Sequence, residues 1–108
     1  MTRRIDLMPL MPAEAKALVD AGKAILVDIR EANEYARERI DGASLAPLSR
    51  LGAGDRITPA GGKFVIFHCQ SGMRTAGNAR RLAGACAGEA YVLAGGINAW
   101  KAAGLPTA

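Results

Sequence analysis

The sequence predicts a single α/β domain with a small parallel sheet of about five strands and helices on both faces. Short apolar runs alternate with helical segments along the chain, a pattern typical of parallel sheets with right-handed crossovers. The run at 24–29 is almost continuously apolar, as expected of a strand that is buried on both faces. A length of 108 residues suits one hydrophobic core but not two, so the predicted domain spans residues 1–108.

The first half of the chain alternates between helix and strand. Apolar residues recur at helical spacing within 9–21, and Pro12 and Gly22 suit the beginning and the end of that helix. The charged segment 31–39 has acidic residues early and arginines late, which matches a helix dipole. The other elements of this half are strands at 24–29 and 43–46 and a loop at 50–62 that is rich in glycine.

The second half contains the segment with the most reactive chemistry. Residues 64–67 are β-branched or aromatic and follow two glycines, which indicates a buried strand, and Cys69 comes at its carboxyl end. Ligands of parallel α/β sheets bind beyond the carboxyl ends of the strands, so this cysteine is well placed for a functional role. A helix at 76–86, a strand at 91–93 and a helix at 96–103 complete the predicted domain.

The loop that follows Cys69 has the composition of an anion cradle around a thiolate. Free backbone N–H groups at the beginning of a helix point toward negative charge, and Gly72 lets the loop turn tightly enough to aim them inward. The guanidinium of Arg74 adds positive charge, and all these groups favour the nucleophilic thiolate near neutral pH. The predicted catalytic residues are Cys69 and Arg74, and the predicted substrate-binding residues are Gln70, Ser71, Gly72, Met73 and Thr75.

Other polar residues near this loop favour structural interpretations. His68 precedes Cys69 by one residue, so its side chain is predicted to point to the opposite side of the strand, in a structural role rather than as a general base. Asp28 and Arg30 flank the end of a central strand and are predicted to form a buried ion pair that orients the loop. Cys86 lies on the apolar stripe of its helix, which favours core packing over a role as a resolving thiol.

Composition argues against several classes of partner. Lys and Arg number 14 against 10 Asp and Glu, but the basic residues are scattered and aromatic residues make up only 5%, so no nucleic-acid partner is predicted. Two cysteines and one histidine lack the spacing of metal ligands, and we expect neither a metal nor an organic cofactor. The low number of cysteines is typical of a reducing compartment, so we expect a cytoplasmic location. No apolar run approaches the ~20 residues of a membrane helix.

Three blocks of the sequence, at 26–35, 69–75 and 91–106, together resemble single-domain rhodaneses, the thiosulfate sulfurtransferase-like family. The resemblance implies a rhodanese-like fold. It also implies a cycle in which Cys69 takes the outer sulfur of thiosulfate or of a low-molecular-weight persulfide, becomes a persulfide, and passes the sulfur to cyanide or a thiol. The implied partners are a small-molecule donor and acceptor, and a protein thiol is a further candidate acceptor.

Two positions depart from the family pattern. Residues 38–43 read Glu-Arg-Ile-Asp-Gly-Ala where relatives usually have Gly-His-Ile-Pro-Gly-Ala, a region that is structural in the family. Met73 stands where relatives that favour thiosulfate often carry a cation, and its apolar, adaptable side chain predicts a weaker preference for a dianionic donor.

Some relatives are fused to membrane spans or redox domains. If this chain is a piece of a membrane-anchored parent, we expect it to lie at the cytoplasmic face of the membrane.

The length of the loop leaves other functions open. Cysteine phosphatases and arsenate reductases of related fold use the same cradle as C-x5-R, whereas this chain has C-x4-R, which suits a single sulfur atom better than a phosphoryl group. His68 next to the cysteine is similar to the His-Cys pair of phosphatases and keeps that alternative open. A noncatalytic binding module of rhodanese fold is a third hypothesis, against which the presence of both Cys69 and Arg74 counts.

Overall fold

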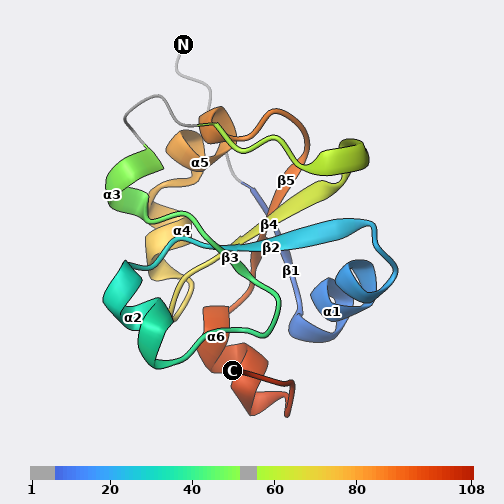
Figure 1. Cartoon of the computed structure of the whole chain (residues 1–108), viewed down its shortest axis with the longest axis vertical. Coiled ribbons are helices and arrows are strands. Elements are labelled where there is room, and N and C mark those ends of the chain that lie inside the picture. Colours follow the sequence, from blue (N-terminus) through green and yellow to red (C-terminus); the bar gives the residue numbers. More distant parts are fainter. Residues whose placement is uncertain (1–6, 52–55) are drawn as a thin grey trace.

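A single parallel sheet organises the chain (Figure 1). The computed structural model describes residues 7–51 and 56–108, and within these ranges five strands are ordered β1-β5-β4-β2-β3 with parallel pairing throughout. The strands are β1 (Met8–Leu10), β2 (Ala24–Asp28), β3 (Ser44–Leu45), β4 (Phe64–His68) and β5 (Ala90–Leu93). The predicted α/β class with about five parallel strands is therefore confirmed.

Helices pack on both faces of the sheet, and the alternation of side chains along the strands creates two apolar clusters. One cluster joins Leu26 and Ile66 to helices α1 and α6, and the other joins Val27 and Phe67 to α3 and α5. The helices are α1 (Pro12–Asp20), α2 (Ala32–Arg37), α3 (Leu48–Leu51), α4 (Met73–Gly77), α5 (Ala79–Ala85) and α6 (Gly96–Ala102), with a 3₁₀ turn at Ala60–Gly62.

The beginning of the chain contains a strand that the sequence did not predict. The edge strand β1 pairs with β5 through Leu10 and Leu93, and α1 then begins at Pro12, where the sequence predicted the beginning of the helix. Three residues are too few to show a periodic pattern, and Pro9 is tolerated because β1 lies at the edge of the sheet. The pairing partner that makes this segment a strand comes from the far end of the sequence.

The predicted helix at 76–86 is also wrong in its extent. The structure has two short helices that meet at Asn78, whose φ of −127° is outside the helical range. The Asn78 side chain donates a hydrogen bond to the carbonyl of Arg74 at 2.8 Å, and such bonds to nearby backbone compete with a continuous helix. The first of these helices begins at Met73, so the residues that follow the cysteine loop are helical sooner than predicted.

Smaller differences affect the elements around β3. The helix predicted at 31–39 is limited to Ala32–Arg37, and the strand at 43–46 to two residues. The loop predicted at 50–62 includes the end of α3 and the 3₁₀ turn, and its residues 52–55 lie outside the described part of the chain.

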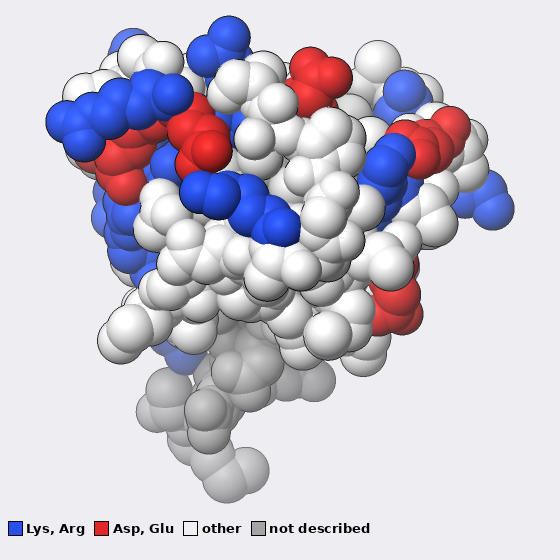
Figure 2. Space-filling model, turned by 90° about the horizontal axis from the view of Figure 1, so that it is seen from below, with Lys and Arg blue, Asp and Glu red and all other residues white. Residues whose placement is uncertain are grey.

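The described residues contain no helix that is both long and apolar enough to cross a membrane. Figure 2 shows one face of the molecule, where basic and acidic side chains lie next to one another around a broad uncharged area. Two ion pairs of the described surface illustrate this mixing, Lys16 with Asp20 and Lys101 with Glu38. On this face, therefore, the basic side chains do not form a continuous stripe.

Candidate active site

Cys69 lies directly after β4, in the middle of the sheet, at the edge where the strands end. Asp28 pairs in register with His68, so the residues that follow β2 lie beside the cysteine loop. The amide of Ile29 donates to the carbonyl of His68 at 2.9 Å and holds the two strand ends together. The predicted position of the cysteine at the carboxyl end of a buried strand is thus confirmed.

The sulfur of Cys69 is enclosed by its own loop. The backbone N–H of Gly72 donates a hydrogen bond to Sγ at 3.1 Å, and the hydroxyl of Thr75 lies 3.9 Å from Sγ. That hydroxyl in turn donates to the carbonyl of Gly72 at 2.9 Å, which closes the loop. The cysteine is only 1% exposed, so only a slender group could reach the sulfur.

Gly72 is a glycine because of its backbone conformation. Its φ of 94° lies in the left-handed region, where other residues are strained. A Cβ atom at this position would also lie 3.3 Å from the backbone nitrogen of Gly95. The tight turn that aims the Gly72 amide at the sulfur therefore requires this residue.

The beginning of α6 supports the loop from behind. Ile97 N–H donates to the carbonyl of Cys69 at 3.0 Å, and Asn98 N–H donates to the carbonyl of Gln70 at 3.1 Å. A Cβ atom on Gly96 would lie only 2.4 Å from the Cys69 carbonyl oxygen. The first residues of α6 therefore bind the loop carbonyls. The close approach of the two backbones is possible because residue 96 is glycine.

The sequence did not predict this support from α6. Its sequence signal was the pair of glycines at 95–96, which can be read as an ordinary turn into a helix. The close approach of two backbones far apart in sequence became visible only in the folded chain.

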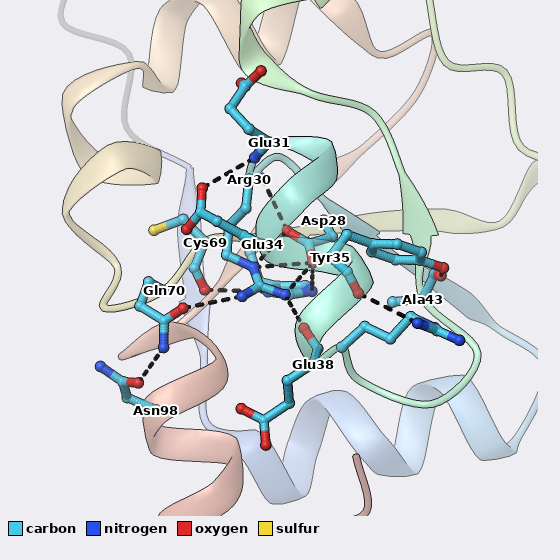
Figure 3. A network of polar contacts seen from close by, with 12 residues as sticks. Asp28, Arg30, Glu31, Glu34, Tyr35, Glu38, Ala43, Cys69, Gln70 and Asn98 are labelled. Carbon is cyan, nitrogen blue, oxygen red and sulfur yellow. Dashed lines mark hydrogen bonds and ion pairs between the residues drawn. The ribbon is translucent and has the colours of Figure 1, made fainter. Parts of the chain in front are cut away.

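A buried arginine connects β2, α2 and the loop (Figure 3). Arg30 donates to both carboxylate oxygens of Asp28, at distances from 2.8 to 3.1 Å, and to the backbone carbonyl of Glu38 at 2.6 Å. Its remaining terminal nitrogen donates to the side-chain oxygen of Gln70 at 3.0 Å. The predicted buried ion pair is confirmed, and it contacts the loop directly.

Gln70 uses its side chain within the protein. Its amide oxygen accepts from Arg30, and its amide nitrogen donates to Asn98 at 2.6 Å. The sequence-based expectation gave this residue a direct contact with substrate. In the structure its side chain instead joins the buried arginine to α6 and so helps to fix the loop.

Arg74 is bound by an acidic residue of α2. Its two terminal nitrogens each lie 2.8 Å from an oxygen of Glu34. These hydrogen bonds, with further help from the backbone of Glu31, lower the pKa of the Glu34 carboxyl to about 2, although partial burial opposes the shift. The same pairing raises the pKa of Arg74. The cation expected to face a bound anion is thus neutralised within the protein.

The remaining loop residues are on the outside. Ser71 is exposed, and the side chain of Met73 is 78% exposed at the beginning of α4. Of the predicted site residues, the structure therefore brings Gly72 and Thr75 to the sulfur. It ties Gln70 and Arg74 to neighbouring elements and leaves Ser71 and Met73 facing outward.

His68 is fully buried, and its ring lies between two oxygens of the protein. Nδ1 is 3.2 Å from the carbonyl oxygen of Cys69, and Nε2 is 3.7 Å from a carboxylate oxygen of Asp28 without a hydrogen-bond partner among the described residues. Burial lowers the pKa of His68, and the nearby Asp28 carboxylate opposes that shift only in part. These contacts agree with the structural role predicted for this histidine.

The family is shown by comparison with known proteins. Residues 11–103 match the Rhodanese-like domain family, and the chain belongs to that family. An uncharacterized protein of Synechocystis sp. is 38% identical over 98 residues, which cover 91% of this chain and 54% of the relative. A probable adenylyltransferase/sulfurtransferase, MoeZ of Mycobacterium tuberculosis, is 30% identical over 93 residues, which cover 84% of this chain and 24% of the relative. The chain thus spans about half of the first relative and about a quarter of the second.

Solved structures with the same fold include several rhodanese-type proteins. The match to a thiosulfate sulfurtransferase from Pseudomonas aeruginosa covers 100% of this chain and 20% of the length of that protein, at a TM-score of 0.78 and 21% identity. A rhodanese-related protein from Thermoplasma volcanium covers 94% of this chain with 97% of its own, at a TM-score of 0.76 and 21% identity. A protein of unknown function from Rhodopseudomonas palustris, described as a possible tyrosine phosphatase, has a TM-score of 0.70 and 28% identity, over 93% of this chain and 83% of its own.

Proposed function

We propose that this chain is a sulfurtransferase that moves a sulfane sulfur from thiosulfate or a low-molecular-weight persulfide to cyanide or a thiol. The sulfur is carried as a persulfide on Cys69. The reaction needs no metal and no organic cofactor, because the thiol itself is the carrier. Both cysteines are free, and the reducing conditions of the cytoplasm would keep them so.

The surroundings of Cys69 Sγ support this proposal best. A buried thiolate requires hydrogen bonds that stabilise its negative charge. Gly72 supplies one such bond at 3.1 Å, and the Thr75 hydroxyl lies close to the same sulfur. A persulfide adds one sulfur atom, with its negative charge at the outer sulfur, and polar groups of a short loop suit a group of that size.

The proposed cycle has two displacements at sulfur. In the first, the Cys69 thiolate attacks the outer sulfur of thiosulfate, the bond between the two thiosulfate sulfurs breaks, and sulfite leaves with the electron pair. In the second, cyanide or a thiolate attacks the outer sulfur of the Cys69 persulfide. The bond to Sγ breaks, thiocyanate or an organic persulfide leaves, and the thiolate is restored.

Two kinds of evidence favour this reaction over transfer of a phosphoryl group. The name of the mycobacterial relative includes sulfurtransferase, in agreement with the proposal. In this chain Arg74 is bound on both terminal nitrogens by Glu34, whereas stabilisation of a phosphoryl group requires donors aimed at its oxygens. An aryl phosphate and arsenate are therefore the reference substrates for the alternative.

The experiment that tests the proposal is the intact mass of the purified protein after incubation with thiosulfate, and separately with glutathione persulfide. We expect the mass of one additional sulfur atom, mapped to Cys69 by peptide analysis. Addition of cyanide should then restore the original mass and release thiocyanate.

A folded protein that gains no sulfur from either donor would contradict the proposal. A screen with an aryl phosphate and arsenate would follow, and turnover of either would assign the alternative function. No turnover of any of these compounds would favour a noncatalytic binding module.

A further inference from the structure

Two cationic groups beside the cysteine loop, Arg30 and Arg74, are already paired within the protein. Glu34 binds both terminal nitrogens of Arg74, and Asp28, Gln70 and the carbonyl of Glu38 together bind the guanidinium of Arg30. The hollow on this side of the loop is lined by Arg30, Glu34, Arg37, Glu38 and Gln70. Arg30 pairs with Asp28, Glu34 with Arg74 and Glu38 with Lys101, so Arg37 is the charged side chain of this lining that has no ion-pair partner among the described residues. A dianion therefore meets one uncompensated positive charge there, which is less than its own charge of two.

A second hollow beside the loop has no charged side chain in its lining. It has a volume of about 290 Å³ and lies between the loop, the α4–α5 segment, the edge strand β1 and its neighbour β5. Gly72 and Thr75 form part of its wall, and these are the two residues that contact Sγ of Cys69. The rest of the wall consists of apolar residues and glycine, among them Leu7, Ala76, Ala79 and Val92.

These two observations indicate a class of sulfur donor, and this inference rests on the proposed function. We infer that the sulfur donor suited to this site is an organic persulfide with an uncharged, apolar body, in preference to the thiosulfate dianion. Glu34 sets one part of this preference because it neutralises Arg74. The uncharged hollow sets the other part, because an alkyl group placed there leaves water.

The loading step with such a donor is balanced within the two reactants. The Cys69 thiolate attacks the outer sulfur of the alkyl persulfide, and a new bond forms between the two sulfurs. The bond between the outer sulfur and the alkyl sulfur breaks, and the alkyl thiolate leaves with the electron pair. The proton of the persulfide stays on the transferred sulfur, and no external oxidant or reductant takes part.

The charge part of the inference is tested with Glu34→Gln. A glutamine oxygen can still accept the hydrogen bond from the backbone N–H of Glu31 that caps α2, so the helix is retained while Arg74 loses its counter-charge. We expect kcat/KM for thiosulfate to rise roughly five- to tenfold, as for one nearby charge in a partly exposed site, and kcat/KM for butyl persulfide to change much less. Asp20→Asn is the matched control, because it removes one acid from the Lys16 ion pair on α1 and should change neither value.

The hollow is tested by the length of the donor. Each buried CH₂ contributes about 0.8 kcal/mol, so butyl persulfide should exceed ethyl persulfide in kcat/KM by roughly tenfold in the wild-type protein. Ala76→Leu places a side chain against the wall of the hollow and should reduce that ratio toward one. Ala17→Leu, an exposed position of α1, is the control that should keep the ratio.

The outcomes of these experiments distinguish a failure of the proposed function from a failure of the inferred donor class. A wild-type protein that takes sulfur from none of the donors contradicts the proposed function itself. One that takes sulfur but is loaded more efficiently by thiosulfate than by butyl persulfide, or equally well by the two alkyl persulfides, overturns the inference alone. If Glu34→Gln does not fold, Met73→Lys tests the same idea by adding a cation at an exposed loop position, and an unchanged preference between donors then counts against the inference.

Discussion

The two cysteines of this protein are both free and both buried in the same apolar cluster, at 1% exposure for Cys69 and 6% for Cys86. They differ in the backbone group that faces the sulfur. A loop N–H donates to Sγ of Cys69 at 3.1 Å, whereas Sγ of Cys86 lies 4.0 Å from the carbonyl oxygen of Glu89. A donor stabilises a thiolate, and an acceptor does not. Burial alone therefore does not distinguish the proposed nucleophile from a core residue.

The largest effect on activity is expected from substitution of the two cysteines themselves. Cys69→Ser should lower sulfur transfer by at least about a thousandfold, because the carrier atom is lost. Cys86→Ala should keep most of the activity, because this residue packs against Leu82 and Ala85 in the core. Thiocyanate release from thiosulfate and cyanide measures both variants, and circular dichroism checks their folds. Activity that survives in Cys69→Ser would place the nucleophile elsewhere.

A second prediction concerns Arg30, the buried arginine beside the Cys69 loop. Arg30→Met leaves the Asp28 carboxylate buried without its ion pair, and breaking such a pair lowers the free energy of unfolding by about 3–5 kcal/mol. Arg74→Met removes a pair in which the arginine side chain is 38% exposed and should lower stability by less than about 1 kcal/mol. Urea denaturation compares the two variants. Equal losses would mean that the buried network is no more important to the fold than the exposed pair.

A third prediction tests the contact between α6 and the loop. Gly96→Ala places a Cβ atom within 2.4 Å of the Cys69 carbonyl oxygen and should lower stability by roughly 2–3 kcal/mol and activity severalfold or more. Gly104→Ala is the matched control, with a similar positive φ of 75° but no atom within 4 Å of the added Cβ. Its loss of stability should be about 1 kcal/mol, with activity retained. Thermal unfolding and thiocyanate release measure both, and equal activity in the two variants would argue against positioning by α6.

The smallest expected effect is the pH dependence of stability that comes from His68. Its pKa is lowered in the folded state from an ordinary value of 6.5, so above that pH the histidine is neutral in both folded and unfolded chains. As the pH falls through 6.5, the unfolded chain binds a proton that the folded protein does not, and stability falls by at most ~1.4 kcal/mol per pH unit. His68→Phe should flatten this slope between pH 7.5 and 5.5. An identical slope in urea denaturation of both proteins would exclude His68 as its cause.

Much of the fold could be predicted because its signals are local. Apolar runs of four to six residues indicate buried strands whatever they pair with, and β2, β4 and β5 lie where the sequence placed them. The position of Cys69 follows from the same rule, because the residue after a central strand lies at the edge where ligands bind. Gly72 was also predictable, since a tight turn with a donor aimed inward requires a residue that accepts a positive φ.

The rest depended on partners that are distant in sequence. β1 is a strand only because it pairs with β5, and Gly96 matters only because α6 meets the cysteine loop. Arg74 looked like a free cation in the sequence, but its partner Glu34 is 40 residues away. Periodicity and turn preferences act over a few residues, so they were enough to locate β2, β4 and β5, the tight turn at Gly72 and the position of Cys69. Which charges neutralise one another was decided only when the folded chain brought α2 against the loop, because electrostatic pairing depends on distance in space.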